Sequence, residues 1–358
     1  MKISNPIKYC FSLLILLFIL NCSSEKPIVN VISQELPKNY IAYYINEKIT
    51  IDGKDEENVW KEALWSDSFI DIEGVKIPKF KTQFKTLWDE ENLYFYSKME
   101  DPHIWGNLKQ RDTIVYYNND FEIFIDPNGD THNYMEIEIN ALNTVWDLFL
   151  TKPYRNKATV LNQWDLKGLQ SSVYVSGTLN DSSDIDKFWT VEIAIPWDSI
   201  REETGKKLPI LGQTWRFNFS RVHWDFDLND DLYYRKKNTK SKFLPPYNWV
   251  WSPHGVINMH EPEKWGFIHF AKKVSRTNQP KFQYPDDSSL ILWMYSQYRN
   301  QLNLRNNKSI FPVKGSISSE IVVLEKIKYP NGYFLKAKSP KTNIVYYINE
   351  QGKLSSEL

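Results

Sequence analysis

The sequence predicts a mainly β protein, an antiparallel β-sandwich followed by a small C-terminal α+β appendage. Residues 86–101, 118–130 and 134–147 alternate apolar and polar side chains with a period of two, the pattern of strands that turn one face to a core. Turn signals such as Pro127-Asn128-Gly129 and Pro245-Pro246 separate the alternating segments. Short strands divided in this way are typical of two antiparallel sheets packed face to face.

Length and composition fit a globular protein with a large core. The chain has 358 residues, of which 42% are hydrophobic and 15% aromatic, enough for one large domain or two modest ones. Its 44 basic and 44 acidic residues balance. This balance argues against nucleic acid as a partner, because nucleic-acid binding depends on a basic face. The sequence leaves the oligomeric state open.

The N-terminus has the pattern of a secretory signal. Lys2 and Lys8 precede the apolar run 11–20, which is too short to span a bilayer comfortably. The sequence Ile19-Leu20-Asn21-Cys22 resembles a lipobox, in which the cysteine becomes the lipidated N-terminus after cleavage. We therefore expect residues 1–21 to be a lipoprotein signal peptide. Cys22 would then anchor an exported protein in the cell envelope, with the outer membrane as the expected site. A plain secreted protein with an incidental cysteine is the alternative.

The folded part is expected to begin after a short tether. Residues 22–38 are polar and lack periodicity, as expected of a linker between anchor and domain. The sandwich is then predicted over residues 39–272. Its one clear helical turn covers residues 54–64, where acids at the start favour the positive end of the helix dipole.

The C-terminal extension, residues 273–358, is predicted to mix one helix with strands. The helix runs from about Ser288 to Arg305, with apolar residues at helical spacing. Pro330-Asn331-Gly332 is a strong hairpin signal, and residues 344–348 offer a third strand. This extension carries no motif with a known chemistry.

Two of the predicted strands carry acids on their polar faces. Glu122 alternates with apolar residues in the first, and Glu136, Glu138 and Asn140 do so in the second. We expect these faces to be wet. Their oxygens could accept hydrogen bonds from sugar hydroxyls, with Arg216 as a donor. A solvated face on which glutamates and arginines pair is the alternative.

The same segments carry a resemblance to a known family. An IDG element at residues 51–53 and a tryptophan at Trp60 precede LWDEENLYF, DFEIFIDPNGD and EINALNTVWD, which are followed by WTVEIAIPW, RFNFSR and PEKWGFIHF. In this order they resemble carbohydrate-binding module family 9, in the lipoprotein form of Bacteroidetes-type bacteria, over residues 39–270. The resemblance implies a β-sandwich that binds a polysaccharide or oligosaccharide without cleaving it, in support of polysaccharide catabolism.

The resemblance also implies where the sugar binds. Sugar-binding members hold it in a slot between two aromatic side chains, and a strand glutamate contacts its hydroxyls. By position that glutamate is Glu122, and the first aromatic is Tyr116 or Tyr117. The second position holds Met259 or His260, where better-known members have tryptophan, so other tryptophans are candidates for a platform. The complete set expected at the carbohydrate site is Tyr116, Tyr117, Glu122, Glu138, Asn140, Trp105, Trp146, Trp251, Met259, His260 and Arg216.

A second feature suggests a cation. Asp126, Asn128 and Asp130 stand at alternate positions, and residues 225–231 repeat that spacing, which lets several oxygens converge on a hard cation. Family 9 modules commonly hold structural calcium, so the resemblance implies calcium, with Asp126, Asn128 and Asp130 as the expected ligands. An ordinary hairpin turn would explain the same residues.

An enzymatic function stays open, although the sequence favours binding without catalysis. A hydrolase acting on O-glycosyl bonds needs two carboxyl groups across a cleft, for which Glu122 with Glu136 or Glu138 are the candidates. The resemblance supports this only in that family 9 modules often occur joined to xylanases.

Two further functions also stay open. A haem-binding sandwich could use Met135, Met259 or His260 as iron ligands. A scaffold whose sugar slot has decayed would fit the missing second tryptophan.

Overall fold

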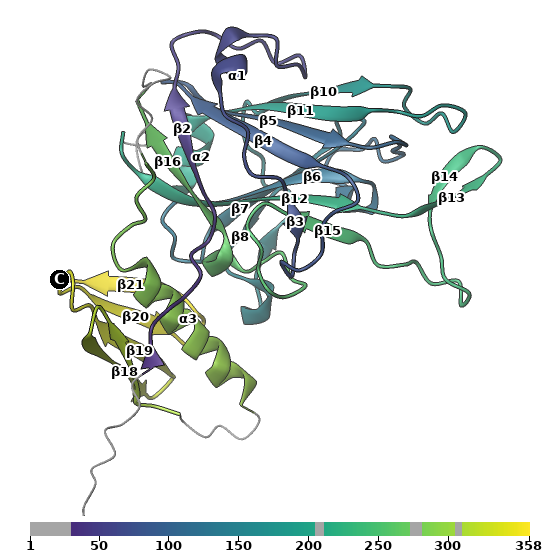
Figure 1. Ribbon diagram of the computed structural model, residues 1–358. Coiled ribbons are helices and arrows are strands. Elements are labelled where there is room, and N and C mark those ends of the chain that lie inside the picture. Colours follow the sequence, from purple (N-terminus) through teal and green to yellow (C-terminus); the bar gives the residue numbers. More distant parts are fainter. Residues whose placement is uncertain (1–29, 205–210, 273–280, 305–309) are drawn as a thin grey trace, which may run out of the picture.

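The computed structural model describes residues 30–204, 211–272, 281–304 and 310–358. They form one large curled sheet, a projecting hairpin and a smaller C-terminal sheet packed on a helix (Figure 1). The prediction of a mainly β protein is therefore confirmed. The predicted signal peptide and the lipidation site Cys22 lie outside the described residues. Within the described ranges, none of the helices has both the length and the apolar composition needed to cross a membrane.

Thirteen strands share the large sheet. Their order along the hydrogen-bonded path is β10 (Gln170–Ser176), β11 (Phe188–Pro196), β5 (Asn92–Glu100), β4 (Thr82–Trp88), β2 (Asn39–Tyr44), β16 (Gly266–Ala271), β12 (Thr214–His223), β6 (Asp120–Asp126), β7 (Tyr134–Asn140), β8 (Val145–Leu150) and β9 (Val160–Leu161). β15 (Tyr247–Val250) also pairs with β12, and β3 (Ile70–Asp71) pairs with β15. All neighbours are antiparallel except β2, which runs parallel to both β16 and β4.

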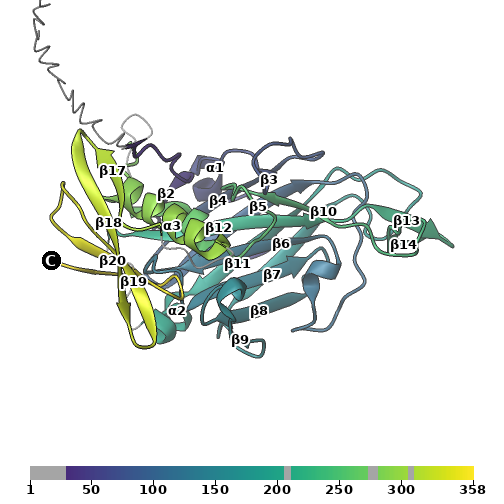
Figure 2. The same cartoon turned by 90° about the horizontal axis from the view of Figure 1, so that it is seen from below.

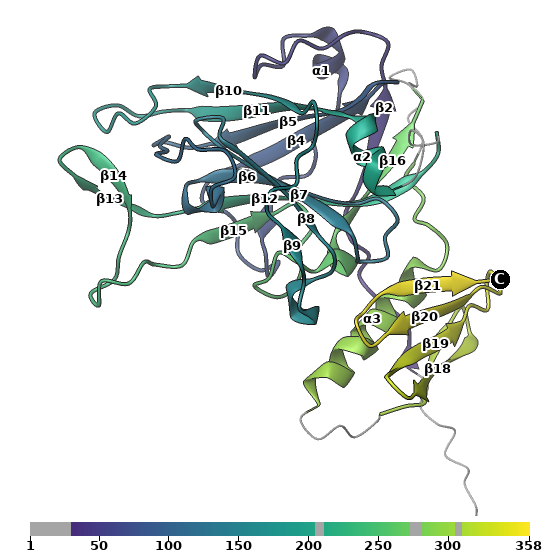
Figure 3. The same ribbon diagram turned by 180° about the vertical axis from the view of Figure 1, so that it is seen from behind.

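The sheet curls so that its two halves face each other as the layers of a sandwich. Figures 1 and 3 show β10, β11, β5 and β4 in one layer and β12, β6, β7 and β8 in the other. Phe84 of β4 stacks on Phe219 of β12 with ring centroids 3.8 Å apart, and Phe95 and Phe121 pack around the same ring. The apolar residues of the alternating segments thus fill the core. The strand β2 pairs in parallel with β16 and β4 and so joins the two layers into one continuous sheet. The predicted antiparallel sandwich did not include this parallel pairing.

The predicted helix near residue 54 is present but shorter. α1 covers Asn58–Glu62 and buries Val59 and Trp60. The acids before it do not lie in its first turn, contrary to the expectation. Trp60 donates its indole N–H to Glu192 on β11 at 2.8 Å, so the turn is fixed by the layer beneath it. A second helix, α2 (Trp197–Thr204), follows β11.

The C-terminal unit contains the predicted helix, hairpin and third strand, together with strands that were not predicted. It consists of α3 (Ser288–Asn303), β17 (Val313–Ile317), β18 (Glu320–Tyr329), β19 (Gly332–Lys338), β20 (Val345–Asn349) and β21 (Leu354–Glu357). β18 and β19 form the hairpin at Pro330-Asn331-Gly332. The strands that were not predicted are β17, β21 and β1 (Asn30–Val31), which pairs with β17. Ile32, directly after β1, is buried in this unit's core. Part of the segment predicted as a tether is therefore structured.

Three short helical turns and one hairpin complete the described part of the chain. The turns are η1 (Val115–Tyr117), η2 (Tyr154–Asn156) and η3 (Pro262–Lys264), and the hairpin is β13 (Phe226–Asn229) with β14 (Leu232–Arg235). Figure 2 shows this hairpin at the opposite end of the sandwich from the C-terminal unit.

Gly266, at the start of β16, has no room for a side chain. A Cβ atom there would lie 2.2 Å from Trp251 and 2.9 Å from the carbonyl oxygen of Lys38. Gly266→Ala is expected to lower the free energy of unfolding by about 1–3 kcal/mol because of overpacking, measured by urea denaturation. Gly106→Ala is the control, since its Cβ would meet nothing closer than 3.4 Å. Equal losses in the two variants would contradict this reading.

Candidate functional site

Carboxyl side chains gather on the outer face of the layer formed by β12, β6, β7 and β8. The register of β12, β6, β7 and β8 places Glu122 opposite both Ser220 and Glu138, and Glu138 opposite Trp146. Glu136 lies on the same face of β7, two residues before Glu138. Opposite residues on one face have Cβ atoms about 5 Å apart, so the pairing of the strands sets the acids side by side.

This face is buried, so the expectation that it is wet was wrong. Glu122, Glu136 and Glu138 are at most 5% exposed, and Asn140 is 0% exposed. The turns η1 and η2 and the loop after β15 contribute residues that lie over the acids. An alternating pattern shows which residues share a face, but it does not show that distant segments fold back over it.

A cavity of about 320 Å³ remains between the acids and the segments that cover them. We call it the acidic cavity. It is lined by Tyr116, Glu122, Glu136, Glu138, Trp146, Leu148, Tyr154, Val222, Asn248, Ile257, Asn258, Met259 and His260. Its volume lies at the lower end of the range of roughly 300–1,000 Å³ typical of small-molecule sites.

Burial raises the pKa values of the acids at this cavity. Burial, together with repulsion between the carboxylates, raises the pKa values of Asp120, Glu136 and Glu138 well above their usual range. Burial raises the pKa of Glu122 to about 7. Oxygens of Asp120, Glu122 and Glu138 lie within 4.8 Å of one another. At neutral pH the cluster therefore holds protons, and protonated carboxyl groups both donate and accept hydrogen bonds.

Aromatic side chains form one wall of the cavity. Tyr116 and Trp146 stack with ring centroids 6.4 Å apart and an interplanar angle of 26°. The backbone of Tyr116 is fixed on both sides, because its N–H donates to Glu138 at 3.0 Å and its carbonyl accepts from the Trp224 indole at 2.7 Å. Its ring is 36% exposed. The wall is therefore a flat aromatic surface that is fixed by hydrogen bonds to the Tyr116 backbone and is partly exposed to solvent.

Two polar atoms of the lining residues have no protein partner. The Oε2 atom of Glu122 and the Nε1 atom of Trp146 are buried and form no hydrogen bond within the described part of the chain. Buried polar groups are normally paired. The lining therefore offers a hydrogen-bond acceptor and a hydrogen-bond donor to a bound molecule.

The loop after β15 supplies Met259 and His260. The Nδ1 atom of His260 lies 3.0 Å from the Tyr134 hydroxyl, and its Nε2 atom lies 4.0 Å from Glu136. Burial lowers the pKa of His260 to about 3, so the ring is neutral. His254 holds the loop from behind, with its ring nitrogens 2.6 Å from the Asn218 amide and 2.7 Å from the Asn258 carbonyl oxygen.

Two arginines fix the end of this loop. Arg155, on η2, lies 3.1 Å from Glu261 and 2.8 Å from Glu263. Arg299, on α3 of the C-terminal unit, lies 3.1 Å from Glu261. The loop that carries Met259 and His260 is therefore tied both to the sandwich and to the C-terminal unit.

The structure brings together six of the eleven residues predicted for a carbohydrate site. Those six line the acidic cavity: Tyr116, Glu122, Glu138, Trp146, Met259 and His260. Tyr117 and Trp105 line a different cavity, beside the β13–β14 hairpin.

The remaining three predicted residues have structural contacts elsewhere. Trp251 is 1% exposed and packs in the core between the layers. Asn140 is buried and bonds to Leu108, Asn118, Leu142 and Thr144, which fixes the neighbouring loops. Arg216 lies on the acidic face but at its far end. There its guanidinium covers the Phe267 ring and donates to the Trp265 carbonyl oxygen at 2.8 Å.

Of the three residues suggested as haem ligands, Met259 and His260 line the acidic cavity and Met135 does not. Met135 is fully buried in the core between the layers, while Met259 packs on the other side of β7, against the cluster that contains Phe124 and Tyr134. Because successive residues of a strand point to opposite faces, Met135 cannot reach a group bound beside His260.

The residues expected to bind calcium form a hydrogen-bonded turn. The Asp126 carboxylate accepts the N–H groups of Gly129 and Thr131, both at 2.9 Å. The side chains of Asn128 and Asp130 bond to each other. Among the described residues, two clusters of three acidic side chains have oxygens close enough together to hold a metal ion. Neither cluster includes Asp126, Asn128 or Asp130. Calcium at this position stays a prediction.

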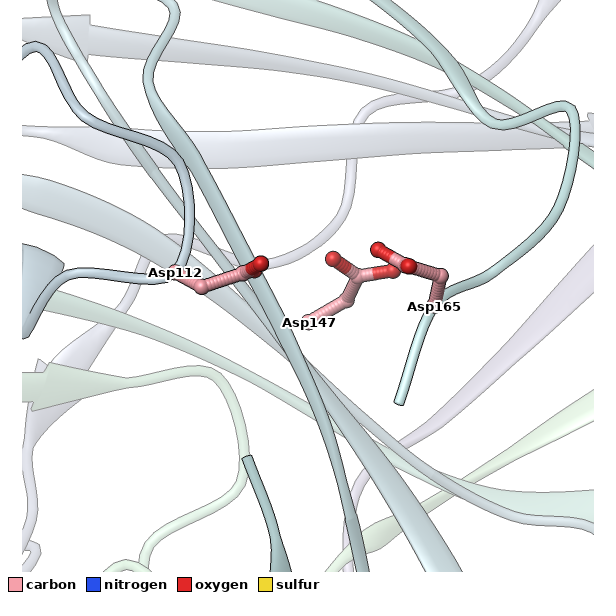
Figure 4. Close-up of side chains that lie close together, drawn as sticks. All are labelled: Asp112, Asp147 and Asp165. Atoms are coloured by element: carbon pink, nitrogen blue, oxygen red, sulfur yellow. The ribbon is translucent and has the colours of Figure 1, made fainter. Parts of the chain in front are cut away.

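One of the two convergent acid groups consists of Asp112, Asp147 and Asp165 (Figure 4). Arg111 lies among them, hydrogen-bonded to Asp147 and 2.9 Å from Asp165. A cation already occupies the position between these acids, so the group does not fit a metal. The other group is the one at the acidic cavity.

Some lining residues were not singled out from the sequence. Tyr154 contacts His260 edge-on, with centroids 4.4 Å apart, and Asn258 lies in the covering loop. Tyr154 lies on the short turn η2 and Asn258 lies in a loop, and in neither does a periodic pattern show which way a side chain points. The sequence offered one indication for Tyr154, which directly follows Pro153 and comes soon after two strands that carry acidic residues.

Comparison with known proteins identifies a family model and a relative that match parts of this chain. The family model described as carbohydrate family 9 binding domain-like matches residues 51–240. The endo-1,4-beta-xylanase C of Paenibacillus barcinonensis is 33% identical over 88 residues, which are 24% of this chain and 8% of that enzyme. The chain thus spans a small part of this curated relative.

Three solved structures match this chain at low sequence identity. A protein from Bacteroides uniformis ATCC 8492 is 15% identical, with a TM-score of 0.49 over 65% of this chain and 99% of that one. A family 9 carbohydrate binding module from Caldicellulosiruptor kristjanssonii, solved with cellotriose, is 17% identical, with a TM-score of 0.43 over 69% of this chain and 100% of the module. Its complex with glucose is 18% identical, with a TM-score of 0.43 over 68% and 100%. Since the family model matches more than half of the chain, this protein belongs to the carbohydrate family 9 binding domain-like family.

Proposed function

We propose that the acidic cavity binds a saccharide without breaking its bonds. The observation that carries this proposal is the stacked wall of Tyr116 and Trp146 beside buried carboxyl groups, with Glu122 Oε2 and Trp146 Nε1 left without protein partners. A pyranose has an apolar ring face and a rim of hydroxyls. An aromatic wall next to polar atoms matches both surfaces.

The role of each group follows from its chemistry. The rings of Trp146 and Tyr116 cover the apolar face of the sugar. Glu122, whose carboxyl is partly protonated near neutral pH because its pKa is about 7, exchanges hydrogen bonds with hydroxyls in either direction. A negatively charged sugar is disfavoured here, because it would bring a further charge to a cluster that already resists ionisation.

Affinity is expected to be modest. Each sugar hydroxyl exchanges hydrogen bonds with water for similar bonds with protein, and the net gain per bond is about 1 kcal/mol. The fixed backbone of Tyr116 lowers the ordering cost of binding. Weak single sites of this kind suit a protein that concentrates polysaccharide at a surface.

The cellular setting belongs to the same proposal. A lipid on Cys22, suggested by the lipobox-like sequence before it, would hold the sandwich at the cell envelope. Binding there would support polysaccharide catabolism by bringing glycan to enzymes of the same cell. The family membership supports carbohydrate binding, and the N-terminal sequence supports the anchor.

Trp146→Ala tests the site. Loss of the ring should weaken binding at least tenfold, equivalent to about 1.4 kcal/mol, measured by calorimetry with neutral oligosaccharides chosen from a screen of plant and algal glycans. Trp65→Ala is the matched control, because Trp65 is a partly exposed ring outside the cavity. Thermal unfolding of both variants confirms that they are folded at the assay temperature.

Two outcomes would overturn the proposal. Equal affinity in wild type and Trp146→Ala would remove the acidic cavity as the site. Release of new reducing ends from the oligosaccharides by wild type, abolished in Glu122→Gln, would identify a hydrolase instead.

A further inference from the structure

A second cavity, which we call the hairpin cavity, lies on the other side of η1. It has a volume of about 450 Å³, and its lining includes Trp105, Tyr117, Arg235, Lys237 and Phe243. The ring centroids of the adjacent Tyr116 and Tyr117 lie 5.1 Å apart with an interplanar angle of 76°, and each ring lines one of the two cavities. The two cavities are therefore neighbours that share η1 as their partition.

The hairpin cavity is positively charged, in contrast to the acidic cavity. The guanidinium of Arg235 lies 4.2 Å from the ring centroid of Tyr117 and 4.1 Å from that of Phe243. Lys237 lies 5.0 Å from Phe243. Within the described part of the chain, neither cation forms an ion pair with a carboxylate. Rings hold these cations in place but leave their charge without an anion.

The one carboxylate of the lining does not cancel this charge. Asp227 lies 3.5 Å from Lys236, so its charge is already offset by a lysine from outside the cavity. Arg235 presents a planar fork of N–H donors, the geometry that suits carboxylate and sulfate oxygens.

Trp105 adds an independent sign of a ligand. Its ring is 2% exposed and stacks on Tyr233 at 6.2 Å with an interplanar angle of 6°. Its Nε1 atom is buried and has no hydrogen-bond partner among the described residues. A buried donor without an acceptor in the lining of a cationic cavity calls for an oxygen-rich ligand.

The geometry points to the hairpin cavity as a binding site for the anionic unit of an acidic saccharide, either a uronate carboxylate or a sulfate ester. This inference rests on the proposed function, since it assigns the protein's saccharide a charged unit. The acidic cavity takes a neutral unit, and the hairpin cavity takes the charged one. The protein would then distinguish acidic glycans from neutral ones.

The test compares three probes by calorimetry at low salt: oligogalacturonides, sulfated galactan oligosaccharides and neutral cello-oligosaccharides. Arg235→Gln should weaken binding of at least one anionic probe about tenfold and leave the neutral probe unchanged. Lys237→Gln, at an exposed position with little risk to folding, should weaken the same probe severalfold. Lys240→Gln is the charge-matched control, because Lys240 is exposed and does not line the cavity. The preferred probe separates carboxylate from sulfate recognition.

The outcomes separate this inference from the proposed function. If Trp146→Ala abolishes binding of the neutral probe while Arg235→Gln and Lys237→Gln change nothing, the hairpin-cavity inference is wrong and the acidic cavity stands. If the Arg235 and Lys237 variants lose only the anionic probes while Trp146→Ala changes nothing, the acidic-cavity proposal is wrong. If wild type binds none of the three probes, both are overturned.

Discussion

Arg221→Met is expected to lower the free energy of unfolding by about 3–5 kcal/mol, the cost typical of breaking a buried ion pair from one side. The Arg221 side chain is 0% exposed and lies 2.9 Å from the Asp101 carboxylate, which is 3% exposed. It also donates to the Glu100 carbonyl oxygen at 2.7 Å. Without the arginine, Asp101 would stay buried beside His223, which lies 3.8 Å away and whose pKa is lowered by burial, so that no permanent cation would face the carboxylate. Urea denaturation followed by tryptophan fluorescence would measure the loss.

Lys38→Met is the matched control for this prediction. Lys38 pairs with Asp67 at 2.8 Å, but the side chains are 32% and 71% exposed, and exposed pairs contribute at most about 1 kcal/mol. Adding Asp101→Leu to Arg221→Met should recover part of the stability, because it removes the stranded charge. Recovery should be partial, since His103 and Asn119 also donate to Asp101. A similar loss in Arg221→Met and Lys38→Met would show that burial of the pair does not matter.

The stability of the protein is expected to fall as the pH rises above 7. Burial raises the pKa values of Asp120, Glu136 and Glu138 well above their usual range. In the unfolded chain these groups ionise near pH 4, so above that pH the folded state binds more protons. Stability therefore decreases as pH rises until the folded pKa is passed. The slope is about 1.4 kcal/mol per pH unit for each group that is still protonated only in the folded state.

Histidines do not contribute in this window. Burial lowers the pKa of His132 and His254 to about 4 and that of His260 to about 3. Unfolded histidine titrates near pH 6.5, so above pH 7 these rings are neutral in both states. Below that pH they act in the opposite direction, because the unfolded chain then takes up protons that the folded state excludes.

Glu136→Gln isolates the effect of the carboxyl cluster. The variant keeps the shape of the side chain but cannot ionise, so its stability should decline less between pH 7 and pH 9 than that of wild type. Urea denaturation at pH 7, 8 and 9 in the presence of a chelator provides the measurement. Glu47→Gln, at an exposed position, should keep the wild-type slope. Identical slopes in all three proteins would mean that the buried acids are already ionised at pH 7.

The sequence predicted the sandwich well because its strands obey one simple rule. Phe121, Ile123 and Ile125 occupy alternate positions of one strand, and all three lie in the core. The hairpin at Pro330-Asn331-Gly332 was equally readable, because a two-residue turn of this type has few alternatives. The parallel pairing of β2 could not be predicted, because β2 and its partner β16 are far apart in the sequence and such pairing leaves no local sequence pattern.

The candidate site was predicted in part, for a related reason. Tyr116, Glu122, Glu138 and Trp146 lie on or beside paired strands, so their positions follow from strand periodicity and register. Tyr117 and Tyr116 are adjacent in sequence yet line different cavities, because a tight helical turn sends successive side chains in different directions. The burial of the acids depends on irregular segments that fold over them, and no periodicity encodes that.

The arginine contacts at Glu261 have a practical consequence for how this protein is divided. Arg155 and Arg299 hold that carboxylate from two sides, one from each folded unit. A fragment ending after β16, the natural boundary for producing a sandwich alone, would keep the first arginine and lose the second. Such a truncated product would have a looser rim beside Met259 and His260, so affinities measured on it would understate those of the intact chain.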